Sequence, residues 1–178
     1  MKRKIIIATL CSIAFSGFSQ KYTAEKSFVS FYSHGTIEDI AAENTKTVSL
    51  FNTATGDVVF AVPIKEFEFD KSLMKEHFNE KYMDTEKFPK STFQGKITGF
   101  QIDGKGEQKV TAVGKLTMHG ITQEVQIPGS IEVLDGKIVM KSTFVVKLAD
   151  YKIEIPKLLW QNIAEQVEVK MEFTYKPL

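Results

Sequence analysis

The chain has 178 residues, the length of one domain, and carries 23 basic and 22 acidic side chains. This near balance lacks the basic excess with which proteins bind nucleic acids or anionic membrane surfaces, so we expect neither partner. The charged residues alternate with apolar ones, a pattern typical of solvated strand faces.

The N-terminus has the composition of a secretory signal peptide. Three basic residues, an uncharged apolar stretch that ends at Phe18 and the small residue Ser19 follow one another there. The apolar stretch is shorter than the roughly 20 residues that a stable membrane span needs. We therefore predict a signal peptide at residues 1–19 and a periplasmic or secreted domain at residues 20–178. Cys11 leaves with the signal, so the mature chain has no cysteine.

Residues 60–69 show the first clear alternation of apolar and polar side chains, and a period of two predicts strands. Residues 70–83 break this period. Asp70 can cap a helix there, and Met74 and Phe78 lie four residues apart on one apolar stripe. We therefore predict a short helix over residues 70–83.

The alternation resumes after this helix and is clearest at residues 167–175, where odd positions are apolar and even positions polar. Asp135 and Gly136 predict a two-residue hairpin turn. Residues 156–164 predict a short helix or a loop over the barrel mouth. About eight strands at this spacing predict an all-β fold, either an antiparallel barrel or a sandwich. Glycine-containing segments predict further turns between strands at residues 55–57, 103–106 and 128–129.

Motifs for catalysis or metal binding are missing from the sequence. His34, His77 and His119 lack the short spacing of zinc ligands. The sequence has no Gly-x-Ser-x-Gly nucleophile elbow and no glycine-rich phosphate loop before a helix. We therefore predict a protein that is not an enzyme, with no metal site and no cofactor.

The chain contains 14 phenylalanines and 6 methionines. An eight-stranded barrel can either fill its interior with side chains or enclose one ligand. Flexible methionines such as Met74, Met118 and Met140 suit an adaptable apolar cavity. Composition leaves both alternatives open, a packed core and a ligand cavity.

Three motifs, in order along the chain, resemble those of the YceI-like family. They lie at residues 73–93, at residues 114–122, and at residues 148–151 together with 155–156. The resemblance implies an exported, lipocalin-like, eight-stranded antiparallel barrel with the short helix near one end. Family members hold a polyisoprenoid or a quinone-like amphiphile in an apolar channel.

By this resemblance, inward-facing apolar side chains should contact the tail of the ligand. The family often carries an arginine in the helical segment, whereas this segment has none. Lys71 and His77 are the candidates for a head-group contact, and a neutral quinone-like head suits the sequence as well as a pyrophosphate. The predicted lipid-binding residues are Phe31, Phe60, Phe67, Phe69, Leu73, Met74, Phe78, Phe93, Leu116, Met118, Phe144 and Trp160.

The expected function is an exported binding protein that holds a long-chain amphiphile, a polyisoprenoid or an isoprenoid quinone, for storage or transport. The alternative is a structural or protein-interaction barrel with a filled core and no ligand. The barrel interior distinguishes them, because the first requires an apolar cavity and the second has none. His119 and Gly120 are expected to form a turn or strand kink rather than a ligand contact.

Overall fold

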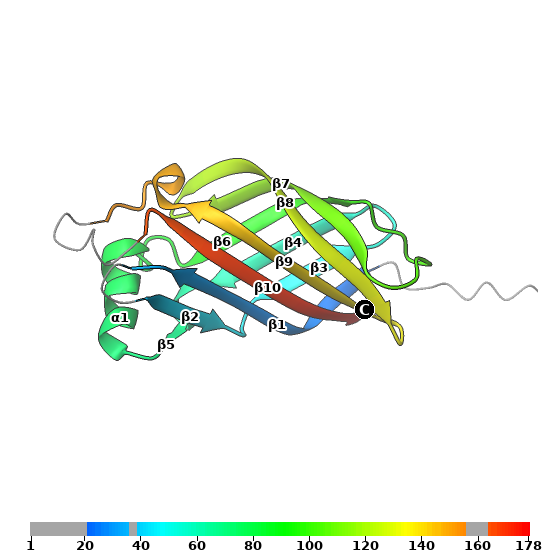
Figure 1. Cartoon of the computed structure of the whole chain (residues 1–178), viewed down its shortest axis with the longest axis horizontal. Helices are drawn as coiled ribbons and strands as arrows, with labels where there is room; N and C mark the ends of the chain where they lie inside the picture. The colour runs from blue at the N-terminus through cyan, green and yellow to red at the C-terminus, as the bar shows by residue number, and fades with distance from the viewer. Residues whose placement is uncertain (1–20, 36–38, 156–163) are drawn as a thin grey trace, which may run out of the picture.

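A closed antiparallel β-barrel forms the body of the protein in the computed structural model (Figure 1), which describes residues 21–35, 39–155 and 164–178. The predicted signal peptide lies outside these residues. Short 3₁₀ helices, η1 (Ile64–Glu66) and η3 (Leu148–Tyr151), follow β4 and β9. The strands are β1 (Lys21–Ser33), β2 (Ile40–Asn44), β3 (Val48–Asn52), β4 (Asp57–Pro63), β5 (Glu68–Phe69), β6 (Lys90–Thr98), β7 (Gln108–Met118), β8 (Ile121–Leu134), β9 (Lys137–Lys147) and β10 (Gln166–Pro177).

Ten strand segments of the described chain fill the eight positions of the barrel, because two positions are each shared by two segments. One edge of β1 pairs with β10 along most of its length, which closes the barrel. The other edge of β1 pairs with β3 at residues 21–23 and with β2 at residues 29–33. β5 continues the line of β4 by pairing with β2. The predicted eight-stranded antiparallel barrel is therefore confirmed.

A short helix lies at one end of the barrel, between β5 and β6 in the chain (Figure 1). It consists of α1 (Ser72–His77) and a π-helical turn, η2 (Phe78–Tyr82). The helix predicted over residues 70–83 is confirmed, but its predicted cap is wrong. Lys71, not Asp70, is the N-cap residue, and it makes no side-chain capping hydrogen bond. Lys71 still has an extended backbone, with φ of −117° and ψ of 124°, so Ser72 is the first helical residue.

Several strands are joined by turns that the sequence predicts. Asp135 and Gly136 join β8 to β9 with φ of 50° and 76°, the left-handed pair of a type I′ hairpin. His119 and Gly120 join β7 to β8 in the same way, so the turn expected there is confirmed. The turn expected at residues 128–129 is wrong, because both residues lie inside β8 and pair with β7.

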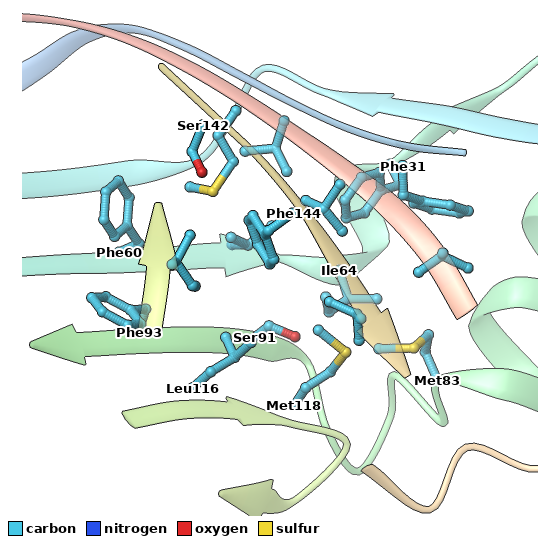
Figure 2. Close-up of a pocket in the computed structure, with 18 of the residues that line it drawn as sticks. Phe31, Phe60, Ile64, Met83, Ser91, Phe93, Leu116, Met118, Ser142 and Phe144 are labelled. Carbon is cyan, nitrogen blue, oxygen red and sulfur yellow. The ribbon is translucent and has the colours of Figure 1, made fainter. Parts of the chain in front are cut away.

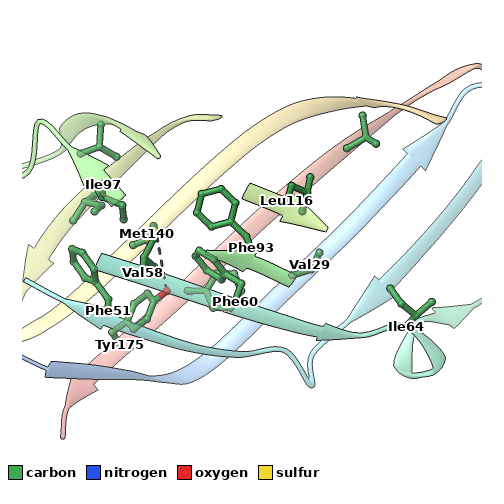
Figure 3. Close-up of a cluster of buried hydrophobic side chains, with 14 of the residues drawn as sticks. Val29, Phe51, Val58, Phe60, Ile64, Phe93, Ile97, Leu116, Met140 and Tyr175 are labelled. Atoms are coloured by element: carbon green, nitrogen blue, oxygen red, sulfur yellow. Dashed lines mark hydrogen bonds between the residues drawn. The ribbon is translucent and has the colours of Figure 1, made fainter. Parts of the chain in front are cut away.

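The barrel is packed with side chains at the end away from the helix (Figure 3). Phe51, Val58, Ile131 and Tyr175 are at most 1% exposed there. The buried hydroxyl of Tyr175 forms a hydrogen bond of 2.7 Å with Ser49 Oγ. Burial raises the pKa of Tyr175, because the low-dielectric core disfavours its charged form. This end of the barrel is therefore a floor of interlocked aromatic and aliphatic side chains.

Candidate functional site

The interior of the barrel is hollow toward the helix. An apolar cavity of about 510 Å³ extends from α1 into the barrel as far as Met140 and Phe173 (Figure 2). Its volume lies within the range of roughly 300–1,000 Å³ that is typical of small-molecule sites. A completely filled core, the alternative left open by the sequence, is not what the structure shows.

The structure brings the predicted lipid-binding residues together on the wall of this cavity. Trp160 is the exception, because it lies outside the described residues. Lys71 and His77, the predicted head-group residues, also line the cavity and belong to the helical segment. Contact of any of these side chains with a ligand stays a prediction. The predicted residues on the wall are Phe31, Phe60, Phe67, Phe69, Leu73, Met74, Phe78, Phe93, Leu116, Met118 and Phe144.

Four phenylalanines form an aromatic cluster where the cavity meets the helix. Phe31, at the end of β1, lies 5.3 Å from Phe67 and 5.9 Å from Phe69 between ring centroids, both edge-to-face. Phe78 stacks on Phe31 at 5.3 Å and also contacts Phe67 and Phe69. Such aromatic pairs each add about 0.5–1.5 kcal/mol beyond their buried area. The cluster therefore fixes the helix against the barrel and gives the cavity an aromatic wall at this end.

Positive charge on the cavity wall is confined to residues that are at least partly exposed. Lys71 and Lys141 are exposed and His77 is half-buried, and these are the charged or ionisable basic side chains among the described residues of the wall. Lys75 and Glu68 form an ion pair of 2.9 Å near the start of the helix. The buried part of the wall carries no charge, so an anionic group there would lie without a counter-ion.

Sequence reasoning missed three serines that line the cavity. Ser33 Oγ accepts a hydrogen bond of 3.1 Å from the amide of Ala164. Ser142 Oγ donates one of 2.6 Å to the carbonyl oxygen of Pro128. Ser91, by contrast, is only 5% exposed and its Oγ has no hydrogen-bond partner among the described residues. Alternation with Phe93 is the sequence signal that could have placed Ser91 inside.

The wall also includes a stretch where β8 and β9 separate. Their ladder runs from the hairpin to the pair Ser130–Lys141 and then stops, although both strands continue. In a two-residue hairpin every second pair exchanges hydrogen bonds, so the next such pair would join residue 128 to Thr143. Pro128 has no amide hydrogen and cannot donate there. Pro128 and Lys141 are outward-facing by the strand alternation, and both are among the residues that line the cavity where the ladder is interrupted.

Chemistry other than binding finds little support in the described residues. Across residues 21–35, 39–155 and 164–178, no three His, Cys, Asp or Glu side chains gather in a way that could hold a metal ion. No helix in these ranges has the length and apolar character to span a membrane. His119 lies in the β7–β8 turn, with Nδ1 3.1 Å from the carbonyl oxygen of Tyr151 and its ring 4.8 Å from Phe88. These contacts explain His119 as part of a structural corner.

Comparison with known proteins agrees with this fold. A family model described as YceI-like domain matches residues 20–175. No curated protein shows significant sequence similarity to the chain.

Three solved structures show the same fold at low sequence identity. A polyisoprenoid binding domain from Saccharophagus degradans, implicated in plant cell wall breakdown, has a TM-score of 0.78 at 16% identity and covers 88% of this chain and 98% of its own. BcnA of Burkholderia cenocepacia has a TM-score of 0.71 at 17% identity, covering 83% of this chain and 95% of its own. The YCEI protein of Campylobacter jejuni has a TM-score of 0.53 at 16% identity and covers 98% of both chains.

Proposed function

The chain belongs to the YceI-like family, and from that membership and the apolar cavity we propose that it is an exported protein that holds a long-chain amphiphile for storage or transport. The cargo is a polyisoprenoid or an isoprenoid quinone. The observation that carries the proposal is the cavity of about 510 Å³, whose buried wall is almost entirely apolar. The polyisoprenoid binding domain of Saccharophagus degradans, a structural neighbour of this chain, supports this class of cargo.

The physics of transfer favours such a cargo. Each methylene group moved from water into an apolar cavity contributes roughly 0.8 kcal/mol, so a long hydrocarbon tail needs little polar help to bind tightly. Met74 and Met118 on the cavity wall can adapt their shape to an irregular isoprenoid chain. Polar contacts then have only to orient the head group.

The mouth of the cavity near the helix is the proposed place for the solvated end of the cargo. Lys71 and His77 lie on the wall there and can contact a polar head through their side-chain nitrogens. The aromatic cluster of Phe31, Phe67, Phe69 and Phe78 would pack against the part of the tail next to it.

Export belongs to the proposal and rests on the N-terminal sequence. The basic, apolar and small-residue regions of residues 1–19 fit a cleaved signal peptide. A periplasmic or secreted location would place the barrel where amphiphiles must cross an aqueous space between membranes or leave the cell.

Native mass spectrometry of the protein purified from its own host, followed by organic extraction, tests both the cargo and the export. We expect a mature chain that starts at Gln20 and carries a co-purifying isoprenoid or isoprenoid quinone of defined mass. A chain that is empty and also refuses added isoprenoids would overturn the carrier function. A chain that retains residues 1–19 would overturn the export by cleavage, independently of its cargo.

A further inference from the structure

Ser91 places an unpaired polar group on the buried part of the cavity wall, whose other described residues, apart from Ser33, are apolar. It is the second residue of β6, and the strand alternation points it inward with Phe93 and Ile97. Figure 2 shows its hydroxyl oxygen among the apolar side chains of the wall. The side chain is 5% exposed, and Oγ has no hydrogen-bond partner among the described residues.

The two other serines on the cavity wall show that an unpaired hydroxyl is not the rule in this barrel. Ser33 and Ser142 both direct Oγ to a backbone group, at 3.1 Å and 2.6 Å. Each of these two oxygens therefore has a backbone partner, Ser33 Oγ as an acceptor and Ser142 Oγ as a donor. Ser91 differs, because burying a hydroxyl without a partner carries a desolvation cost that a bound acceptor would offset.

We infer that Ser91 is a specificity residue whose hydroxyl donates a hydrogen bond to a neutral oxygen atom of the cargo inside the barrel. This inference rests on the proposed function and narrows it. The cargo must then carry a carbonyl or similar neutral acceptor that enters the cavity. A quinone ring meets this requirement, whereas a pure hydrocarbon offers no acceptor.

The neutrality of the acceptor follows from the charges around the cavity. The basic side chains on the described wall, Lys71, His77 and Lys141, are exposed or half-buried, and no buried residue of the wall is charged. A pyrophosphate drawn in beside Ser91 would lose its hydration without gaining a cation. A carbonyl oxygen loses far less hydration, so one hydroxyl donor is enough to compensate it.

Three probes with the same 20-carbon isoprenoid tail test the inference on the protein purified from its host and delipidated. They are menaquinone-4, geranylgeranyl diphosphate and the corresponding isoprenoid hydrocarbon. Dissociation constants come from competition with a fluorescent apolar probe. We expect Ser91→Ala to raise the dissociation constant of menaquinone-4 about three- to tenfold, which corresponds to the loss of one neutral hydrogen bond. The dissociation constant of the hydrocarbon should stay unchanged.

Infrared spectroscopy gives a second readout that a purely structural role would not change. The carbonyl stretch of bound menaquinone-4 should lie at lower frequency in the wild type than in Ser91→Ala, because a hydrogen bond weakens the C=O bond. Ser30→Ala is the matched control, since Ser30 is a serine of β1 that is not among the described residues of the cavity wall. It should leave the quinone carbonyl frequency and the preference for the quinone over the hydrocarbon unchanged.

The outcomes separate this inference from the proposed function. If none of the three probes binds, the carrier function itself is overturned. If Ser91→Ala weakens all probes equally or none of them, the carrier stands and the role of Ser91 is overturned. Tighter binding of geranylgeranyl diphosphate than of menaquinone-4 would overturn the inference that the cargo presents a neutral acceptor to Ser91.

Discussion

Gly95 and Gly114 face each other directly across β6 and β7, and both occupy inward positions of the barrel wall. A Cβ atom added to Gly114 would lie 2.4 Å from the carbonyl oxygen of Gln94 and 2.5 Å from the Cα of Gly95. A Cβ atom added to Gly95 would lie 2.8 Å from the ring of Phe93. The pair therefore lets the two strands approach closely while leaving room for the ring of Phe93 on the cavity wall.

Gly114→Ala should destabilise the barrel by about 3 kcal/mol or more, because the new methyl group meets backbone atoms that cannot move aside cheaply. Urea denaturation monitored by circular dichroism measures this loss in the free energy of unfolding. Lys115→Ala is the matched control, since Lys115 is the next residue of β7 and faces solvent. It should change stability by less than about 0.5 kcal/mol. Equal stability of the two variants would show that the strands can separate here without cost.

Met118→Trp should reduce cargo uptake at least about tenfold, since the larger side chain occupies the cavity volume that the tail needs. Uptake is measured by titration with menaquinone-4 after the thermal melting point has shown that the variant is folded. Val145→Trp adds the same ring on β9 at a position that is 57% exposed, outside the cavity. We expect that control to bind like the wild type. Unchanged uptake in a folded Met118→Trp variant would remove Met118 from the binding site.

The separation of β8 from β9 predicts a distinctive pattern of amide exchange. The amides of Thr143 and Val145 point toward β8, beyond the last paired residue of the ladder, whereas those of Phe144 and Val146 point toward β10. Hydrogen exchange followed by NMR should find the first two at least about a hundredfold faster than the second two.

Replacing the proline should remove this pattern. Pro128→Val supplies an amide hydrogen that can donate to the carbonyl oxygen of Thr143, so the ladder can extend by one hydrogen-bonded pair. We expect the amide of Thr143 to become protected in this variant. Fast exchange of Thr143 in both proteins would show that strand curvature, rather than the missing proline donor, separates the two strands.

Tyr175 should make the protein sensitive to alkali. Burial raises its pKa above the value of about 10 expected in the unfolded chain, so the unfolded state loses the phenolic proton first as the pH rises. The free energy of unfolding should therefore be unaffected by this group below about pH 10. Between about pH 10 and the pKa of Tyr175 in the folded state, the free energy of unfolding should fall by about 1.4 kcal/mol per pH unit.

Tyr175→Phe should reduce this alkaline slope, as measured by urea denaturation between pH 8 and about pH 11. Ser49 would keep its hydrogen bond of 2.7 Å to the carbonyl oxygen of Val59, so the substitution leaves no unpaired hydroxyl there. Part of the slope should remain, because burial also raises the pKa of Tyr82 and of Tyr151. An identical slope in the variant would mean that Tyr175 is not the group that titrates.

Local sequence patterns predicted the strand faces, the hairpin turn and the position of the helix. These features depend on neighbours a few residues apart: alternation at residues 167–175, the left-handed turn at Asp135 and Gly136, and the apolar stripe through Met74 and Phe78. The same alternation allowed the inward-facing apolar side chains to be predicted as lipid-binding residues. Those within the described part of the chain all line the cavity.

The hollow interior, by contrast, depends on contacts between strands that are far apart in the sequence. β1 meets β10 across more than a hundred residues of sequence, and that closure creates the interior whose volume no local pattern specifies. Strand register decides that the backbone nitrogen of Pro128 is directed toward β9. Whether Ser91 Oγ finds a hydrogen-bond partner likewise depends on groups that are distant in the sequence. Hydrogen-bond satisfaction and cavity volume are properties of the whole packing arrangement, so local sequence periodicity cannot encode them.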